Sequence, residues 1–155
     1  MLTLQANSLN WALNHALKYG DTDVFPLSFE YEAIQHNWND LHIWLKSQNI
    51  LDWQVRPHRT LLAPKAKYGF RVITQLDPLD FLIFAATIKE IADDIETRRI
   101  PIHQNVVYSY RFSADTDGQL FDPNIGYATF LNQTQVILRV SIQVEGLTIG
   151  RSQVA

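Results

Sequence analysis

The segment from Asp77 to Pro101 constrains the fold most, because it predicts one long helix whose two ends are both marked. Asp77 can cap the first turn, Pro78 suits the first helical position, and Asp80 lies near the positive end of the helix dipole. Arg98 suits the negative end, and Pro101 prevents continuation. Apolar residues recur at helical spacing between these signals: Leu79, Leu82, Ile83, Ala86 and Ile91.

Two amphipathic helices are expected before this long helix. The first begins after Asn7 or Ser8 and ends at Gly20, and the second begins after Ser28 and ends near Asn49. Large apolar groups at this spacing are typical of helices that face a core. We therefore assign these residues to the core rather than to a cofactor site: Leu9, Ala12, Leu13, Ala16 and Leu17 in the first helix, and Tyr31, Ile34, Trp38, Leu41 and Leu45 in the second.

A β-hairpin is expected between the second and the long helix. Two short runs with β-branched and aromatic residues, 59–63 and 70–76, are separated by the turn-forming segment 64–69. This segment carries Lys65 and Lys67. The hairpin therefore presents two lysines at its turn.

The C-terminal third gives weaker signals. Residues 105–112 are expected to be extended or irregular, and 115–118 to form a turn. Residues 135–144 and 147–149 predict a short strand pair. The fold class expected for the whole chain is α+β, with N-terminal helices, a basic β-hairpin and a long helix.

Length and composition limit the classes of protein to which the chain can belong. Its 155 residues, 46% of them hydrophobic, suit one globular domain. The longest apolar run, 81–86, is far shorter than the roughly 18 residues of a membrane span. Because the first seven residues lack the pattern of a secretory signal, we expect a cytoplasmic location. The absence of cysteine excludes disulfides, thiol nucleophiles and thiolate metal sites.

The net charge of −3 conceals a strongly basic segment. Residues 53–76 contain five bases and no acid, whereas 1–52 contain six acids and two bases, and 77–97 contain six acids and one base. A solvated protein surface is one explanation of such a run. A phosphate-bearing partner is the other, and the net charge does not exclude it.

Most common catalytic and metal-binding patterns are missing. The histidines are scattered, and no pair has the spacing of metal ligands. The acid pairs Asp21/Asp23 and Asp115/Asp117 lie beside glycines, where aspartate commonly closes its own turn. No P-loop, dinucleotide fingerprint or nucleophile-elbow motif occurs. We therefore assign no catalytic residue and no metal ligand.

The basic hairpin carries the one arrangement that suits a defined ligand. Lys65 and Lys67 lie in the turn, and Arg71 follows Gly69 on the returning strand. A lysine offers a point charge to terminal phosphate oxygens, and an arginine can bind a phosphate through two nitrogens or stack on a base. This geometry suits a polyphosphate.

Three stretches, in this order, carry a resemblance to a known family. Residues 62–73 contain the basic pattern P-K-x-x-x-G-x-R, 77–80 open a helix with acids, and 107–112 read V-Y-S-Y-R-F. Together they resemble the fingers of bacterial reverse transcriptases, the RNA-directed DNA polymerases of group II introns, retrons and phage defence. The resemblance covers about residues 5–131.

The resemblance implies roles for individual residues. Lys65 or Lys67 would contact the triphosphate of the incoming deoxynucleotide, and Arg71 would pack on that nucleotide and touch its phosphates. The template, RNA or DNA, would be contacted by charged and aromatic side chains, which supply affinity and stacking. By analogy, these are Arg56, Arg59, Tyr108, Tyr110 and Arg111.

The catalytic part of such a polymerase is not present in the sequence. The family binds two magnesium ions with palm aspartates, whereas 132–155 contain no aspartate. All 18 aromatic residues also lie at or before Phe130. The chain is therefore divided into a fingers-like region, 1–131, and a divergent tail, 132–155, with a frameshift or premature stop as the explanation. No cofactor is assigned to the chain itself, and Mg²⁺ is implied for the complete polymerase.

Three hypotheses of function follow. The first is a fingers fragment that contacts nucleotide and template, without a membrane partner, and needs a separate palm-containing chain for catalysis. The second is a non-catalytic nucleic-acid-binding or regulatory module that uses the basic hairpin. The third is an inert remnant that folds poorly.

Overall fold

The computed structural model describes residues 1–20, 26–65, 69–104, 106–107 and 110–136. It contains the helices α1 (Ala6–Tyr19), α2 (Glu30–His36), α3 (Trp38–Ser47) and α4 (Pro78–Arg98) and the strands β1 (Arg59–Lys65) and β2 (Gly69–Gln75). Two short 3₁₀ helices are η1 (Ile50–Asp52) and η2 (Ile102–Gln104). A further helix covers 127–136. The fold is α+β, as predicted.

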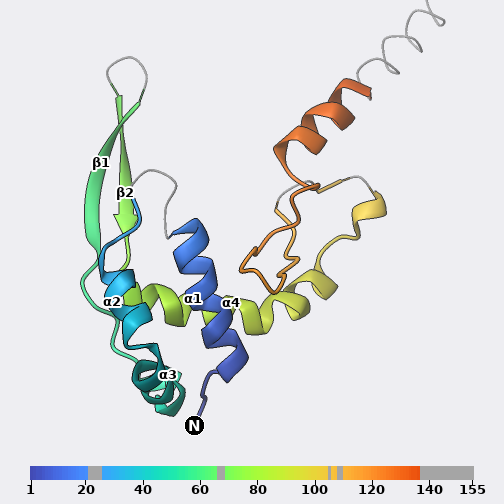
Figure 1. Cartoon of the computed structure of the whole chain (residues 1–155). Helices are drawn as coiled ribbons and strands as arrows, with labels where there is room; N and C mark the ends of the chain where they lie inside the picture. Colours follow the sequence, from blue (N-terminus) through green and yellow to red (C-terminus); the bar gives the residue numbers. More distant parts are fainter. Residues whose placement is uncertain (21–25, 66–68, 105, 108–109, 137–155) are drawn as a thin grey trace, which may run out of the picture.

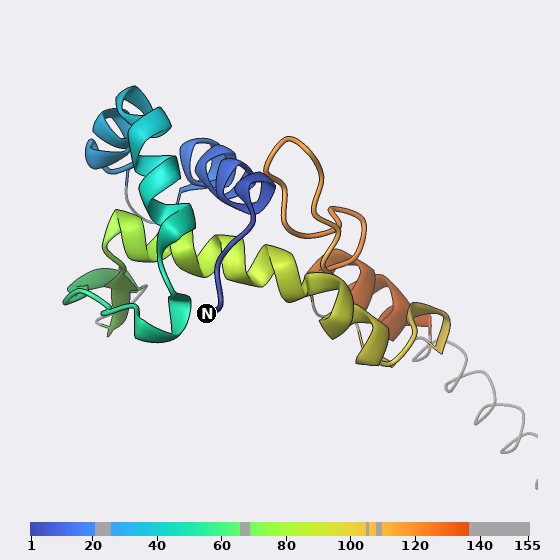
Figure 2. The same cartoon turned by 90° about the horizontal axis from the view of Figure 1, so that it is seen from below.

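The core lies where α1 crosses α4, with α2 and α3 beside them (Figures 1 and 2). Leu9, Ala12 and Ala16 of α1, and Leu82 and Ala86 of α4, are all 0% exposed. Alanines at the crossing let the two helices approach closely, and each fully buried leucine contributes about 1.5–3 kcal/mol relative to exposure. The predicted core stripe of α1 is confirmed, and the apolar stripe of α4 lies in the core except at Ile91, which is 42% exposed.

The long helix begins and ends as predicted. Pro78 is its first residue, and the Asp77 carboxylate accepts a hydrogen bond from the backbone nitrogen of Leu79 at 3.0 Å. Its last residue is Arg98. α1 differs slightly, because it begins at Ala6, before the predicted caps.

The prediction of one helix from Ser28 to Asn49 is wrong, because the helix is interrupted at Asn37. Asn37 has φ −103° and ψ 19°, outside the helical range, and its side-chain nitrogen donates to the carbonyl oxygen of Ala33 at 3.0 Å. Asparagine competes in this way with the regular helical hydrogen bonds. The apolar residues keep their helical spacing on both sides of Asn37, so this spacing does not indicate where the helix is interrupted.

The hairpin is confirmed, and β1 extends through Lys65, which was predicted to lie in the turn. β1 and β2 pair antiparallel, with Arg59 opposite Gln75, Ala63 opposite Arg71 and Lys65 opposite Gly69. It projects away from the helices (Figure 1). Lys67 lies outside the described residues.

The segment after η2 folds back against α1 and α4. Phe112 and Phe121 form an antiparallel bridge, and the predicted turn at 115–118 is confirmed. His15 Nδ1 of α1 donates to the carbonyl oxygen of Gly118 at 2.6 Å. Gly118 has φ +89°, and a Cβ there would lie 2.7 Å from the backbone nitrogen of His15. Glycine is therefore required for this close approach.

The C-terminal strand prediction is wrong where it can be compared. The first two residues of the predicted strand 135–144 belong to the helix at 127–136, which runs across the predicted junction near 131. The rest of that strand, and 147–149, lie outside the described residues. In the part of the chain that the structure describes, no helix has the length and apolar character needed to cross a membrane.

Candidate functional site

The two faces of the hairpin differ in character. Residues that pair directly across an antiparallel sheet share a face. Leu62 pairs with Val72 and Pro64 with Phe70. Leu62, Phe70 and Val72 are 64%, 67% and 70% exposed, so this face is apolar and open.

The opposite face carries two of the three residues predicted to bind a triphosphate, Lys65 and Arg71. Lys65 pairs with Gly69 and Arg71 pairs with Ala63, so Lys65 and Arg71 are diagonal neighbours on one face. The Cα atoms of such neighbours are typically roughly 7–8 Å apart. Both side chains are exposed. The structure thus brings Lys65 and Arg71 together near the turn of the hairpin.

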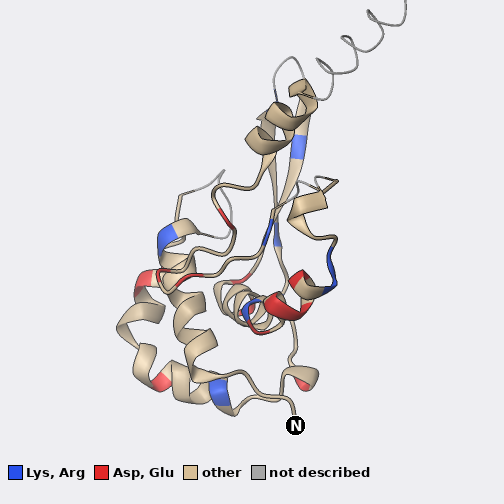
Figure 3. Cartoon of the chain, turned by 90° about the vertical axis from the view of Figure 1, so that its right-hand side faces the viewer, with Lys and Arg blue, Asp and Glu red and all other residues tan. Residues whose placement is uncertain are grey.

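Lys65 and Arg71 have no acidic partner in the part of the chain that the structure describes. Among the described residues, neither Lys65 nor Arg71 forms an ion pair, whereas Arg56, Arg59, Arg99 and Arg111 all do. Figure 3 shows acidic positions on the C-terminal half of α4 and basic positions on the strands. Charge that no protein group neutralises remains available to an anionic ligand.

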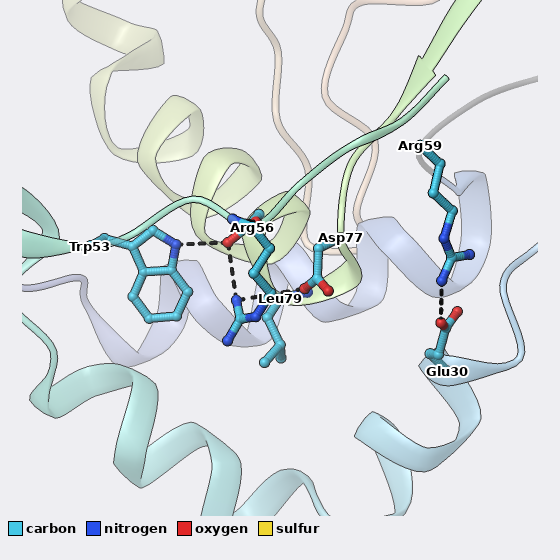
Figure 4. Close-up of polar contacts among 7 residues, drawn as sticks. Glu30, Trp53, Arg56, Arg59, Asp77 and Leu79 are labelled. Atoms are coloured by element: carbon cyan, nitrogen blue, oxygen red, sulfur yellow. Dashed lines mark hydrogen bonds and ion pairs between the residues drawn. The ribbon is translucent and has the colours of Figure 1, made fainter. Parts of the chain in front are cut away.

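Arg56 lies at the root of the hairpin, in the segment 53–58 that leads into β1. It forms ion pairs there instead of lying free on the surface of the hairpin. Its Nη1 lies 3.1 Å from Asp80 Oδ1 and 3.6 Å from Asp77 Oδ1, and its backbone nitrogen donates to Asp80 Oδ2 at 2.7 Å. Trp53 Nε1 donates to Asp80 Oδ1 at 2.8 Å (Figure 4). Asp80 therefore binds the segment that leads into β1.

Arg59 is also paired. Its Nη2 lies 2.6 Å from Glu30 Oε1 of α2 (Figure 4). The arginine side chain is 56% exposed, so this contact is open to water and salt. Template contact, the role that the resemblance implies for Arg56 and Arg59, has to compete with these ion pairs.

Arg111 lies in the interior, at the C-terminal end of α4. Its side chain is 4% exposed, its Nη1 donates to Glu96 Oε2 at 2.9 Å, and its Nη2 donates to the carbonyl oxygen of Ile100. Glu96 Oε1 also accepts from Arg99 Nη1 at 2.7 Å and from the backbone nitrogen of Phe112 at 3.0 Å.

The carboxyl group of Glu96 is stabilised in its charged form. Burial raises its pKa, but the hydrogen bonds from the backbone of Phe112 and the guanidinium groups of Arg111 and Arg99 outweigh burial, so the pKa lies below its ordinary value of 4.5. In this structure Arg111 therefore serves to hold the returning segment on α4.

The aromatic template candidates lie away from the hairpin. Tyr110 is 66% exposed, and its ring centre is 5.1 Å from that of Phe121. The segment around it lies at the opposite end of the molecule from β1 and β2 in Figures 1 and 2. Tyr108 lies outside the described residues. The structure therefore divides the predicted site residues between two separate regions.

A groove that the structure describes borders the acidic partners of Arg56 and Arg59, Asp77 and Glu30, but lies apart from the two hairpin cations. It measures about 640 Å³ and lies between α2, α3 and the start of α4. Its lining is mostly apolar and includes Phe29, Ile34, Leu41, Trp44 and Leu79. Neither Lys65 nor Arg71 lines it. A bound triphosphate at the hairpin would therefore lie on an open surface.

Sequence reasoning missed the acidic partners of the arginines and the sidedness of the hairpin. Glu30 and Asp80 lie 29 and 24 residues from their arginines, and no local pattern reports such contacts. The sidedness had a signal in β2 alone, because Phe70 and Val72 occupy alternate positions there, whereas Leu61, Leu62 and Ala63 of β1 form a continuous apolar run. Among the described residues, no three His, Asp or Glu side chains gather closely enough to hold a metal ion.

Comparison with known proteins gives no match. No family model, no curated protein and no solved structure is significantly similar to the chain. The resemblance to reverse-transcriptase fingers therefore stays a prediction.

Proposed function

We propose that this chain acts as the fingers part of an RNA-directed DNA polymerase, in which the basic hairpin contacts the triphosphate of a deoxynucleotide. One observation carries the proposal: Lys65 and Arg71 lie exposed on one face of a projecting hairpin, and no described acid pairs with either. The basic pattern in 62–73 is the part of the sequence that suggests this family of polymerases.

The two cations have complementary capacities. The ammonium group of Lys65 can approach the terminal phosphate as a mobile point charge, while the planar guanidinium of Arg71 can bind an oxygen pair or stack on the base. The role is binding and orientation. Polymerisation requires magnesium held by palm aspartates, which a separate palm-containing chain would supply, because 132–155 contain no aspartate.

The test is the affinity for a deoxynucleoside triphosphate measured on Lys65→Ala and Arg71→Ala. We expect each substitution to weaken binding roughly tenfold, since a hydrogen bond to a charged group contributes about 1.5–3 kcal/mol. Lys46→Ala, which removes an exposed cation of α3, is the matched control and should leave the affinity unchanged. Unchanged affinity in both hairpin variants would refute this assignment of the hairpin.

A second candidate function is a non-catalytic module that binds single-stranded nucleic acid. The observation that favours it is Phe70, an exposed aromatic ring on the hairpin, because bases stack on such rings with little sequence preference. Its affinity would fall with salt, with a slope of about −0.7 per phosphate contacted on a single strand. Phe70→Ser should then weaken polymer binding and leave triphosphate binding intact. A flat salt dependence would count against this module.

A further inference from the structure

The direction in which the hairpin projects is determined at its root. β1 and β2 pack mainly against each other, and the described helices pack mainly against one another, while Arg59 of β1 forms an ion pair with Glu30 of α2. Figure 1 shows the strands standing clear of the helices for most of their length. The hairpin is therefore held mainly at its root, which consists of Arg59 and of the segments that connect the strands to the helices, 53–58 before β1 and 76–77 after β2.

One buried carboxylate binds the first of these segments. Asp80, in the first turn of α4, is 5% exposed. It accepts hydrogen bonds from Trp53 Nε1 at 2.8 Å, from the backbone nitrogen of Arg56 at 2.7 Å and from Arg56 Nη1 at 3.1 Å. All these donors belong to the approach to β1, so the segment cannot rotate without breaking them.

The surrounding rings restrict the same segment further. The ring of Trp53 packs against Trp44 of α3, with ring centres 5.8 Å apart, and the guanidinium of Arg56 lies 5.3 Å from the centre of the Trp53 ring. The second polar support, the ion pair of Arg59 with Glu30, is more exposed and contributes less. Asp80 is therefore the principal polar support of the hairpin root.

We propose that Asp80 is a positioning residue, which fixes the hairpin in the direction that presents Lys65 and Arg71 to a triphosphate. This inference rests on the function proposed above. Asp80 belongs to α4, a long helix that packs in the core of the protein. Its hydrogen bonds therefore connect the hairpin to a rigid part of the structure. Without this support the two cations sample more orientations, and binding has to restrict them again.

The absence of cysteine makes the direction of the hairpin directly measurable. Leu62→Cys on β1 and Ile43→Cys on α3 replace side chains that are 64% and 68% exposed, and both can carry spin labels. The distance distribution between the labels then reports the hairpin relative to the helices. The background chain should give a narrow distribution.

The test compares Asp80→Asn with Asp93→Asn in this labelled chain. Asp93 is an exposed acid of the same helix, so the control removes the same charge without touching the hairpin root. We expect Asp80→Asn to broaden the distribution about twofold and to weaken triphosphate binding roughly three- to tenfold, with unchanged helical circular dichroism. Asp93→Asn should do neither.

A second variant protects the test against loss of folding. Trp53→Phe removes one donor to Asp80 and keeps an aromatic ring against Trp44, and a smaller broadening is expected. An unchanged distribution in both variants would overturn the inference, and so would broadening without loss of affinity in a chain whose affinity depends on Lys65 and Arg71. If Lys65→Ala and Arg71→Ala leave binding unchanged, the proposed function fails, and the distance distribution alone decides whether Asp80 fixes the hairpin.

Discussion

The helical body, which consists of α1 to α4, and the basic hairpin differ in how completely their apolar side chains are buried. In the body, α1 and α4 meet through residues that water does not reach, such as Leu9 and Leu82. In the hairpin, Leu62, Phe70 and Val72 remain more than half exposed although the strands are regular. The body can therefore hold the fold, while the hairpin depends on it for support.

The charges differ in the same way. Near the end of α4, Glu96 and Arg111 neutralise each other in a largely buried contact. On the hairpin, Lys65 and Arg71 have no described acidic partner. Compensated charge stabilises a fold, whereas uncompensated exposed charge favours an anionic ligand. Glu96 and Arg111 therefore maintain the structure, whereas Lys65 and Arg71 are available for binding.

The largest effect on stability is expected in the body. Leu82→Ala removes a side chain that is 0% exposed and should lower the free energy of unfolding by about 2–5 kcal/mol. Leu62→Ala, the matched change on the hairpin, should alter it by less than about 0.5 kcal/mol. Urea unfolding monitored by tryptophan fluorescence measures both. Equal losses of stability in the two variants would contradict the view that the helical body, and not the hairpin, holds the fold. An unsubstituted chain that unfolds without a cooperative transition would favour the hypothesis of an inert remnant.

The next largest effect is expected where the returning segment touches α1. Gly118→Ala would place a Cβ 2.7 Å from the backbone nitrogen of His15, at a φ of +89° that alanine rarely adopts. We expect a loss of about 1–3 kcal/mol in thermal or urea unfolding. Gly126→Ala is the control, because its Cβ would meet nothing within 4 Å. Similar stability of the two variants would show that the segment does not dock as described.

Glu96 should give the body a dependence on pH. Its pKa is lowered in the folded chain, so its contribution to stability is complete above the unfolded value of 4.5 and is lost as the pH falls through the folded pKa. Glu96→Gln should therefore cost about 1–3 kcal/mol near pH 7, and the difference from the unsubstituted chain should shrink in acid. Urea unfolding across this pH range measures the difference. A constant difference would refute the role of the charge.

The smallest effect is expected at the outer support of the hairpin. Arg59→Ala breaks an ion pair whose arginine is 56% exposed, and such pairs contribute about 0.2–1 kcal/mol. The change in unfolding free energy should fall within this range and vanish at high salt. A larger loss would mean that the ion pair, rather than Asp80, carries the hairpin.

Local features of the fold could be predicted from the sequence. The ends of α4 follow from Asp77, Pro78 and Arg98, whose chemistry acts on neighbouring residues. The strands follow from their β-branched and aromatic residues and from the turn-forming segment between them. The break at Asn37 could not be predicted, because one asparagine changes local hydrogen bonding without disturbing the apolar period.

The candidate site was harder to predict, because its arginines are defined by distant partners. The sequence shows Arg111 beside aromatic residues, but its acidic partner, Glu96, lies 15 residues earlier. Asp80 was expected only to favour the helix dipole, yet it binds Trp53 and Arg56 across 27 and 24 residues. Lys65 and Arg71 could be placed together because one hairpin contains both.

The most direct test of the account follows backbone amide resonances of the isotope-labelled chain while a deoxynucleoside triphosphate is added. We expect the resonances of β1 and β2 around Lys65 and Arg71 to shift with added ligand, while those of Leu9 and Leu82 in the core stay in place. Shifts confined to the helices, or to the groove that Trp44 lines, would contradict the assignment of binding to the hairpin.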